Sequence, residues 1–203
     1  MKKTIIMVIL FLCLGIEHSG ATERTLKQSE QFVLEEQNET VFNKEQAEIK
    51  HCSEKVLIKM QTLWTSLKTE RSLGDQITKS QKQYNEVDIA TMYCETAVNY
   101  GVNVDDLVII GMVETKFNPC ANFNNKGWNV GLQQVNVGIK GRPTKSQMLD
   151  AKLNLRESAR ILKAIQKRVK NRYTAIKHYN GSPRSAQYVI TFKKYERVIN
   201  GKI

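Results

Sequence analysis

Hydrophobic residues recur at spacings of three and four through most of the chain, which is the period of an amphipathic α-helix. The stripes are Ile49, Cys52, Val56, Met60, Leu63 and Leu67; Leu107, Ile110 and Val113; Leu155, Ser158, Leu162, Ile165 and Val169; and Tyr188, Phe192, Tyr195 and Ile199. A further helix is expected over residues 86–100, and the last helix should end before Gly201. The polar segment after Pro119, rich in Asn and Gly, breaks this period. The pattern therefore predicts a mainly α fold.

The first residues carry the pattern of a secretory signal peptide. Lys2 and Lys3 precede an apolar run over residues 5–14, and small residues follow at 19–21. This order predicts that residues 1–21 are removed on export. The run is too short to span a bilayer, which needs about 20 apolar residues, and no other stretch of the sequence approaches that length. We therefore expect an exported protein of the periplasm or cell envelope, with no membrane span after processing.

Residues 22–85 form a polar N-terminal segment, rich in Gln, Glu, Lys, Ser and Thr. The apolar stripe at residues 49–67 predicts an amphipathic helix of about three heptads. A docking helix for a partner, a self-association seam and a face packed on the rest of the protein would all produce this stripe. The weakly apolar flanks, 22–43 and 73–85, are typical of flexible linkers. The expected organisation is thus an extra helical segment, 22–85, followed by a domain over 86–203.

Glu114 is the first candidate for chemistry. Asn103 or Asp105 can cap the helix that contains it, and Glu114 shares a face with the apolar residues of that helix. Pro119 ends the helix within about a turn of Glu114, so the carboxyl lies at the lip of an apolar helix. Desolvation there raises the pKa of a carboxyl and suits it to act as a general acid. On position alone, a paired or capping structural carboxylate is the alternative.

Four motifs around and after Glu114 occur in an order that resembles a known family. They are Glu114-Thr115-Lys116-Phe117-Asn118-Pro119-Cys120-Ala121; Gly127 with Gly131-Leu132-Gln133-Gln134-Val135-Asn136; Asn154-Leu155; and His178-Tyr179-Asn180-Gly181 with Tyr188-Val189. They are similar to the motifs of the soluble lytic transglycosylases, of the goose-type-lysozyme-like class. The resemblance covers roughly residues 88–199, a little over half of the chain. It implies a lysozyme-like helical catalytic domain with a small antiparallel β flap beside the cleft.

The resemblance also implies the site residues, with Glu114 as the catalytic acid. The substrate-binding set would be Thr115, Gln134, Tyr179, Asn180 and Tyr188. From the residues alone, both tyrosines also fit a hydrophobic core, and Asn180 before Gly181 also fits a helix stop. The chain departs from the family pattern at several positions, which indicates a specialised member. These are Thr115 for Ser, Gln133 for Met, Trp128 for a small residue, Ser158 for Gly, and Gly181-Ser182 as a shortened ending.

The chemistry that the resemblance implies needs one carboxylate. A conventional glycosidase uses two, about 5 Å apart for retention or about 6.5 to 9.5 Å apart for inversion. After Glu114 the acids are Asp150, Glu157 and Glu196, and Asp105 lies about 13 Å back along the same helix. As the resemblance implies, Glu114 would protonate the oxygen between MurNAc and GlcNAc and then deprotonate the muramyl C6 hydroxyl, giving a 1,6-anhydromuramyl product. The alternatives are a lysozyme-type hydrolase on the same fold and a non-catalytic peptidoglycan-binding module.

Charge is distributed unevenly along the chain. The sequence has 31 Lys and Arg against 20 Asp and Glu, and residues 138–203 hold 17 of the basic residues. Such a positive field attracts anionic surfaces. For an exported protein we expect peptidoglycan glycan strands as the partner and no nucleic acid; a basic surface that only aids solubility is the alternative. His51 and His178 show no metal-ligand spacing, so neither a metal nor a cofactor is expected. By resemblance, components of a secretion or conjugation apparatus are further expected partners.

The cysteines fit an oxidising compartment. Cys52, Cys94 and Cys120 remain after removal of the signal peptide, and an odd number leaves one outside any single disulfide. In the relatives associated with secretion and conjugation a cysteine often occupies the position of Cys94, and its partner usually precedes the Asn-Leu element, where this chain has no cysteine. The pair expected by resemblance is Cys94 with Cys120, which leaves Cys52 reduced; three reduced thiols are the alternative.

Overall fold

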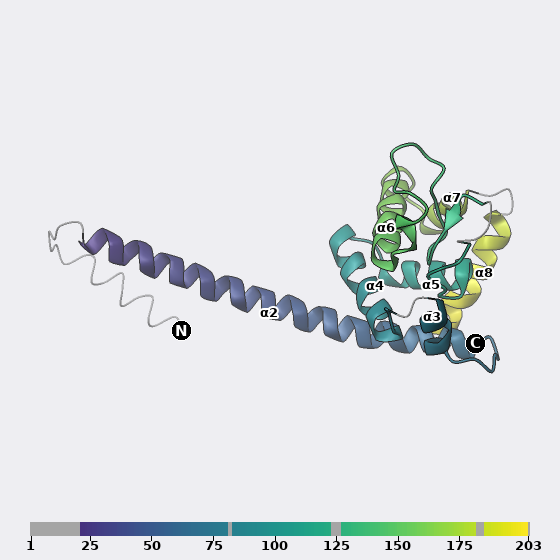
Figure 1. The fold of residues 1–203 in the computed structure, drawn as a ribbon, viewed down its shortest axis with the longest axis horizontal. Coiled ribbons are helices and arrows are strands. Elements are labelled where there is room, and N and C mark those ends of the chain that lie inside the picture. The colour runs from purple at the N-terminus through teal and green to yellow at the C-terminus, as the bar shows by residue number, and fades with distance from the viewer. Residues whose placement is uncertain (1–20, 81–82, 123–126, 182–184, 203) are drawn as a thin grey trace. The chain divides into compact units, whose positions relative to one another are not determined.

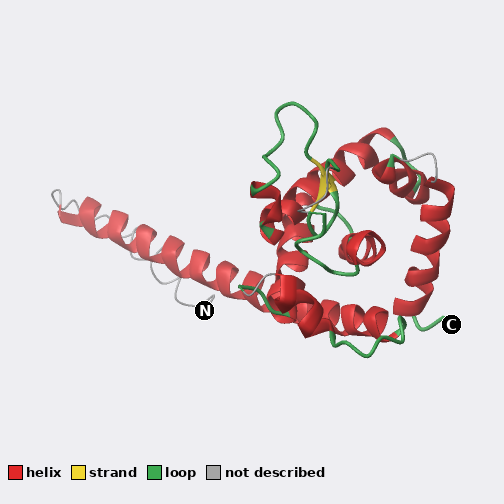
Figure 2. Ribbon diagram, turned by 45° about the vertical axis from the view of Figure 1, so that its right-hand side comes forward, coloured by secondary structure: helices red, strands yellow, loops and turns green. Residues whose placement is uncertain are grey.

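The computed structural model describes residues 21–80, 83–122, 127–181 and 185–202, and the others are drawn in grey in Figure 1. The predicted signal peptide lies outside the described residues except for Ala21. The fold is mainly α, as the sequence predicts, with one short pair of strands (Figure 2). The helices are α2 (Ala21–Thr65), α3 (Leu73–Ser80), α4 (Glu86–Tyr100), α5 (Val104–Thr115), the 3-10 helix η1 (Gln147–Leu149), α6 (Ala151–Arg168), α7 (Arg172–Asn180) and α8 (Ser185–Ile199). Within the described ranges, no helix combines the length and hydropathy needed to cross a membrane.

The chain divides into two compact units, residues 1–46 and residues 47–203. In the first unit the described residues belong to α2, and every side chain described between residues 31 and 46 is exposed, including Phe32 and Phe42. The linker expected over 22–43 is therefore helical. Its composition explains the difference, because this stretch has neither Pro nor Gly and is rich in Glu, Gln and Lys, which favour helix.

The apolar stripe of residues 49–67 packs on the core of the second unit. Val56, Met60 and Leu63 are buried, while Ile49 and Leu67 are partly buried against the same cluster. Of the roles that the stripe could have, the structure shows the face packed on the rest of the protein. The boundary between the compact units accordingly lies between residues 46 and 47, whereas the sequence placed it at residue 85.

Helix α3 occupies most of the second expected linker, 73–85. Leu73 and Ile77 lie four residues apart, so they share one helical face, and both are buried in the core. The prediction of a flexible linker was wrong here. A stripe of two apolar residues is too short to stand out in the sequence, yet it is enough to dock a helix of two turns.

A disulfide joins Cys52 on α2 to Cys94 on α4, with Cα atoms 6.0 Å apart. The predicted pair, Cys94 with Cys120, was therefore wrong, and Cys120 is not disulfide-bonded. Cys52 lies one helical turn before Val56 on the buried stripe, so docking of that stripe brings its thiol to α4. The pairing depends on this packing, which neither the resemblance nor the cysteine spacing contains.

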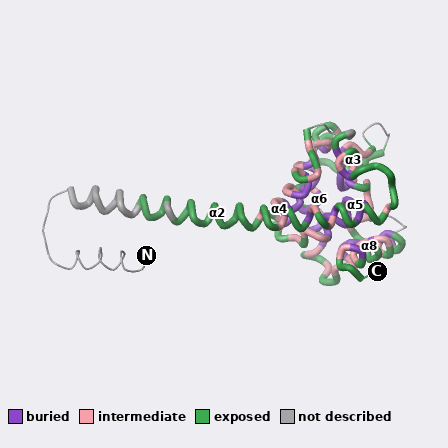
Figure 3. Tube along the Cα trace, turned by 90° about the horizontal axis from the view of Figure 1, so that it is seen from below, coloured by how far each residue is buried: buried purple, intermediate pink, exposed green. Residues whose placement is uncertain are grey.

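Helix α5 lies at the centre of the second unit, between α4, α6 and α8 (Figures 1 and 3). Its residues from Asp106 to Met112 are all buried, so the helix is covered on every side rather than along one stripe. Asn103 is the N-cap, and its side chain accepts hydrogen bonds from the amides of Asp105 and Asp106. The buried helix fixes the position of its last turn, which carries Glu114.

Strands β1 (Asn129–Val130) and β2 (Val135–Asn136) pair antiparallel, with Asn129 opposite Asn136. This pair matches the small flap expected from the resemblance. Val130, Val135 and Met148 form a separate small apolar cluster beneath it. The flap is thereby anchored to the segment that leads into α6, and the chain continues from β2 into the loop before η1.

Candidate active site

Glu114 occupies the last turn of α5 and is half-buried. Burial raises the pKa of Glu114 from its ordinary 4.5 to about 7, while the nearby Tyr188 hydroxyl acts in the opposite direction. A carboxyl with such a pKa is protonated in a large fraction of molecules at neutral pH. It can therefore donate a proton to a leaving group and later accept one.

The chain turns sharply after Glu114. Lys116 and Phe117 both adopt left-handed backbone conformations, with φ of 53° and 60°. Non-glycine residues rarely adopt this conformation, and it is commonly found at functional sites. The buried Phe117 ring and a hydrogen bond from the Phe117 amide to the Gly111 carbonyl, at 3.2 Å, hold the turn in place. The turn ends α5 one residue beyond the acid, in agreement with the prediction from Pro119.

Thr115 ties this turn to the segment after β1. Its hydroxyl donates to the Leu132 carbonyl at 2.8 Å and accepts from the Asn118 amide at 3.2 Å. Thr115 does not line the cleft described below. The hydroxyl also lies 3.2 Å from the Gly111 carbonyl, and all three contacts hold the backbone around Glu114. The structure therefore gives Thr115 a structural role in place of the predicted substrate contact.

A cleft of about 490 Å³ opens beside Glu114. It is lined by Glu114, Asn129, Gln134, Val135, Asn136, Ile139, Arg142, Ile161, Ile165, His178, Tyr179, Asn180 and Gly181. Of the residues predicted for the site, Glu114, Gln134, Tyr179 and Asn180 thus meet on one cleft, although the flap, α5 and α7 carry them. A larger hollow of about 810 Å³ lies near Trp64 and Lys116, but none of the residues predicted for the site lines it.

Tyr188 lies behind the acid rather than on the cleft wall. Its side chain is buried in α8 and its pKa is raised well above 10, first by burial and then by the Glu114 charge. Its hydroxyl is near enough to favour the ionised form of Glu114, but it makes no hydrogen bond of normal geometry. A buried hydroxyl without a partner is costly. Tyr188 is therefore placed to donate to Glu114 when that carboxyl is ionised.

Gln134 and Asn180 lie at strained or terminal backbone positions. Gln134 has a φ of 49°, and its side-chain amide donates to the Gly131 carbonyl at 3.0 Å. Its Oε1 accepts a hydrogen bond from Asn122. Asn180 is the last residue of α7, before Gly181 at a φ of 61°. Asn180 therefore combines the two roles considered for it, since it stands at a helix stop and lines the cleft.

A buried polar network behind the cleft was not predicted. The Gln133 side-chain nitrogen donates to the Tyr93 hydroxyl at 2.9 Å and to the Leu107 carbonyl at 3.0 Å. Its oxygen accepts from the Ser158 hydroxyl at 3.3 Å. Gln133 therefore points into the core and does not line the cleft. Gly111 makes room for this network, because a Cβ there would lie 2.0 Å from the Tyr93 hydroxyl.

The same network orients Tyr179. The Tyr179 hydroxyl lies 2.9 Å from the Ser158 hydroxyl and donates to the Gln133 carbonyl at 3.0 Å. Asn154 supports the network, because its side-chain oxygen accepts a hydrogen bond from the backbone amide of Gln133 at 2.8 Å. Tyr179 thus presents its ring to the cleft and its hydroxyl to the core. The sequence did contain a sign of this buried network, because Gln133 and Ser158 both depart from the motif pattern described above and both add polar atoms.

The other carboxylates near this part of the chain are engaged elsewhere. Asp105 pairs with Lys59 at 2.6 Å, and Glu157 pairs with Arg160 at 2.7 Å. Asp150 caps α6 and accepts a hydrogen bond from Tyr84 at 3.0 Å. Glu196 pairs with Arg172, which also binds Asp106. The undescribed residues 123–126 and 182–184 contain no acid. Glu114 is therefore the one carboxylate among the residues that line the cleft.

Searches for similar proteins found no family model, no curated protein and no solved structure that matches this chain. Within the described residues, no group of three or more His, Cys, Asp or Glu side chains is placed to hold a metal ion. The functional interpretation therefore depends on the geometry of the cleft and on the motifs around Glu114.

Proposed function

We propose that the protein is a peptidoglycan lytic transglycosylase with a lysozyme-like catalytic unit. It would cleave the β-1,4 bond between MurNAc and GlcNAc and leave a 1,6-anhydromuramyl end. The observation that carries this proposal is a single half-buried carboxyl, Glu114, with a pKa of about 7 on the wall of a cleft. The order of the surrounding motifs adds independent support.

In the first step, protonated Glu114 donates its proton to the glycosidic oxygen. The bond between that oxygen and C1 of the muramyl residue breaks, and GlcNAc leaves as an alcohol. Positive charge develops on the muramyl C1 and ring oxygen, and the substrate's 2-acetamido group can stabilise it in place of a second carboxylate. Glu114 is left ionised, where the Tyr188 hydroxyl can donate a hydrogen bond to it.

In the second step, ionised Glu114 accepts the proton of the muramyl C6 hydroxyl. The C6 oxygen attacks C1 and forms the anhydro bond, so no water enters the product. Glu114 is protonated again at the end of the cycle. A carboxyl that alternates between acid and base works best with a pKa near the operating pH, which is the effect of its burial here.

A lysozyme-type hydrolase is the main alternative. Such an enzyme usually has a second carboxylate about 5 to 9.5 Å from the acid, which acts as the nucleophile or activates a water. Asp105, Glu157 and Glu196 are instead paired with Lys59, Arg160 and Arg172, and Asp150 caps α6. Among the described residues, no second carboxylate lines the cleft. A non-catalytic peptidoglycan-binding module is the second alternative, but binding alone does not call for an acid with a raised pKa.

The biological setting is part of the same proposal. The predicted signal peptide and the basic C-terminal half suit an exported protein that acts on the cell wall. Local opening of the wall during assembly of a secretion or conjugation machine would fit an enzyme of this size. Location of the gene far from any such system would weigh against this setting without affecting the proposed chemistry.

Mass spectrometry of the products formed from purified peptidoglycan tests the proposal. The mature protein should release anhydromuropeptides, and Glu114→Gln should release none. Glu157→Gln is the matched control, because Glu157 lies outside the cleft and should keep the activity. Products with reducing ends would establish the hydrolase instead. The absence of products from every variant, together with retained binding to the wall, would favour the binding module.

A further inference from the structure

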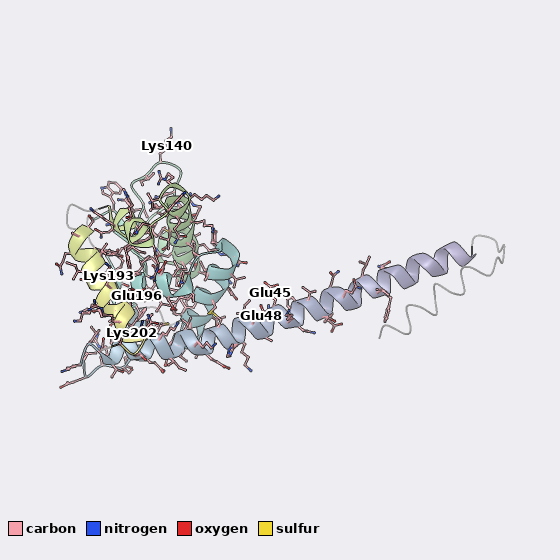
Figure 4. All side chains as sticks on the ribbon, turned by 180° about the vertical axis from the view of Figure 1, so that it is seen from behind. Glu45, Glu48, Lys140, Lys193, Glu196 and Lys202 are labelled. Carbon is pink, nitrogen blue, oxygen red and sulfur yellow. A yellow bond between two sulfur atoms is a disulfide. The ribbon has the colours of Figure 1, made fainter. Side chains whose placement is uncertain are left out.

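Arg142 brings a positive charge to the wall of the cleft that contains Glu114. It lies in the loop between β2 and η1, and it is the one Lys or Arg among the residues that line the cleft. Lys140 belongs to the same loop but is exposed and does not line the cleft. Figure 4 shows Lys140 projecting outward from the tip of this loop. The loop therefore separates two neighbouring cations, one facing the cleft and one facing solvent.

The loop backbone holds Arg142 in its position. The Arg142 amide donates to the Ile139 carbonyl at 3.2 Å and closes a tight turn. Gly141 occupies this turn with a φ of 85°, which other residues rarely adopt. The Arg142 guanidinium reaches back to β2, where Nη1 donates to the Asn136 carbonyl at 2.6 Å. This bond orients the guanidinium before any substrate arrives.

Arg142 differs from two other arginines of the second unit in having no carboxylate close to it among the described residues. Arg160 and Arg172 each have a carboxylate partner, whereas none of the described carboxylates lies within 4.0 Å of Arg142. A guanidinium has five N–H donors, and one described hydrogen bond uses Nη1. The raised pKa of Glu114 is consistent with this, since a close cation would lower it. Most donors of Arg142 therefore remain available to a ligand in the cleft.

We propose that Arg142 forms a subsite for a carboxylate that the substrate carries beside the bond cleaved by Glu114. The proposal deepens the proposed function and rests on it. A muramyl residue carries such carboxylates on its stem peptide, or on its lactyl group once the peptide has been removed. Either would offer a planar pair of oxygens that matches the guanidinium fork. The enzyme would thus select charged strands over neutralised ones.

Binding of soluble muropeptide tetrasaccharides to the Glu114→Gln protein, measured by calorimetry, tests the subsite. Three forms of the ligand are needed: stem peptides with free carboxylates, the same peptides with amidated carboxylates, and chains without peptides that have free lactyl groups. The Glu114→Gln protein should bind at least one of the two forms with free carboxylates about tenfold or more tightly than the amidated form. Adding Arg142→Gln should abolish that preference, and adding Lys140→Gln should preserve it.

The third ligand identifies the source of the carboxylate. Tighter binding of the form with free stem-peptide carboxylates than of both other ligands assigns the stem peptide, and tighter binding of the peptide-free form than of both peptide-bearing forms assigns the lactyl group. Arg142→Lys keeps the charge but loses the fork, so it should retain part of the preference, and unchanged circular dichroism would show that the loop variants fold. The subsite is refuted if the Glu114→Gln protein binds all three ligands equally, or if the protein with both Glu114→Gln and Arg142→Gln keeps the preference for a ligand with a free carboxylate. Equal binding of all three ligands would leave the proposed function intact, while binding of none would count against both.

Discussion

Replacement of Glu114 by Gln should stabilise the folded protein at neutral pH while abolishing catalysis. Burial raises the pKa of Glu114 to about 7, because the half-buried cleft wall disfavours the ionised carboxylate. Between pH 4.5 and 7 the unfolded chain has lost this proton and the folded chain retains it. Unfolding therefore releases a proton, and the free energy of unfolding falls as the pH rises through this window. Gln does not titrate, so the free energy of unfolding of the Glu114→Gln protein does not fall with pH for this reason.

The magnitude follows from the two pKa values. A rise from 4.5 to about 7 corresponds to about 3 kcal/mol of differential interaction between the two protonation states. This is an upper figure, because water in the open cleft screens part of the penalty. The advantage of Glu114→Gln over the wild type should thus increase by up to about 3 kcal/mol from pH 4 to pH 8. The gain illustrates how a catalytic residue can cost stability.

Urea unfolding of both proteins at a series of pH values measures this difference. The quantity to plot is the free energy of unfolding of Glu114→Gln minus that of the wild type, with the disulfide intact. Glu45→Gln is the control, because it removes a charge of the same sign from an exposed position on α2, where Figure 4 shows Glu45. For Glu45→Gln the corresponding difference should stay nearly constant.

A constant difference for Glu114→Gln between pH 4 and pH 8 would refute the reasoning. It would mean that the carboxyl titrates alike in the folded and unfolded chains, and that burial does not hold its proton. The wild-type rate provides a second check on the same property. It should fall above about pH 7, since the first step needs the protonated acid.

Three further substitutions test the surroundings of the site. Ser158→Ala removes the hydroxyl that holds Tyr179, so kcat should fall about tenfold or more with a change in stability of about 1 kcal/mol, measured by steady-state rates and urea unfolding. Cys52→Ser opens the disulfide and should lower the free energy of unfolding by up to about 4 kcal/mol in the absence of reductant; a reducing agent should have the same effect on the wild type and none on the variant. Gly111→Ala would place a Cβ 2.0 Å from the Tyr93 hydroxyl and should destabilise by about 1 to 3 kcal/mol; a loss below about 0.5 kcal/mol would show that the network moves aside freely.

The sequence predicted best where local chemistry decides the structure. The cap at Asn103, the apolar run of α5 and the stop before Pro119 all lie within a few residues of one another, and together they placed Glu114 at the end of a buried helix. Such features depend on neighbours along the chain, so their pattern is visible without the fold. The flap was expected from the resemblance rather than from local chemistry, and two short strands pair there.

The predictions that were wrong or missing concern contacts between distant parts of the chain. The disulfide of Cys52 depends on how α2 docks against α4, and the role of Thr115 depends on the carbonyl of Leu132 in the next motif. Gln133 was noticed as a departure, but the sequence could not show that its side chain turns toward Tyr93. In each case the deciding partner lies in another element, and a single sequence carries no record of that contact.

The bond between Cys52 and Cys94 also determines what a protease can release from this protein. Residues 68–72, between α2 and α3, are all exposed and lie inside the covalent loop that the bond closes. Exposed connections of this kind are preferred sites of nicking. A single cut there would separate the chain into fragments that remain joined through sulfur. The nicked protein would migrate as one species on a non-reducing gel and as two after reduction, with the N-terminal helix still attached to the rest of the protein until the thiols are freed.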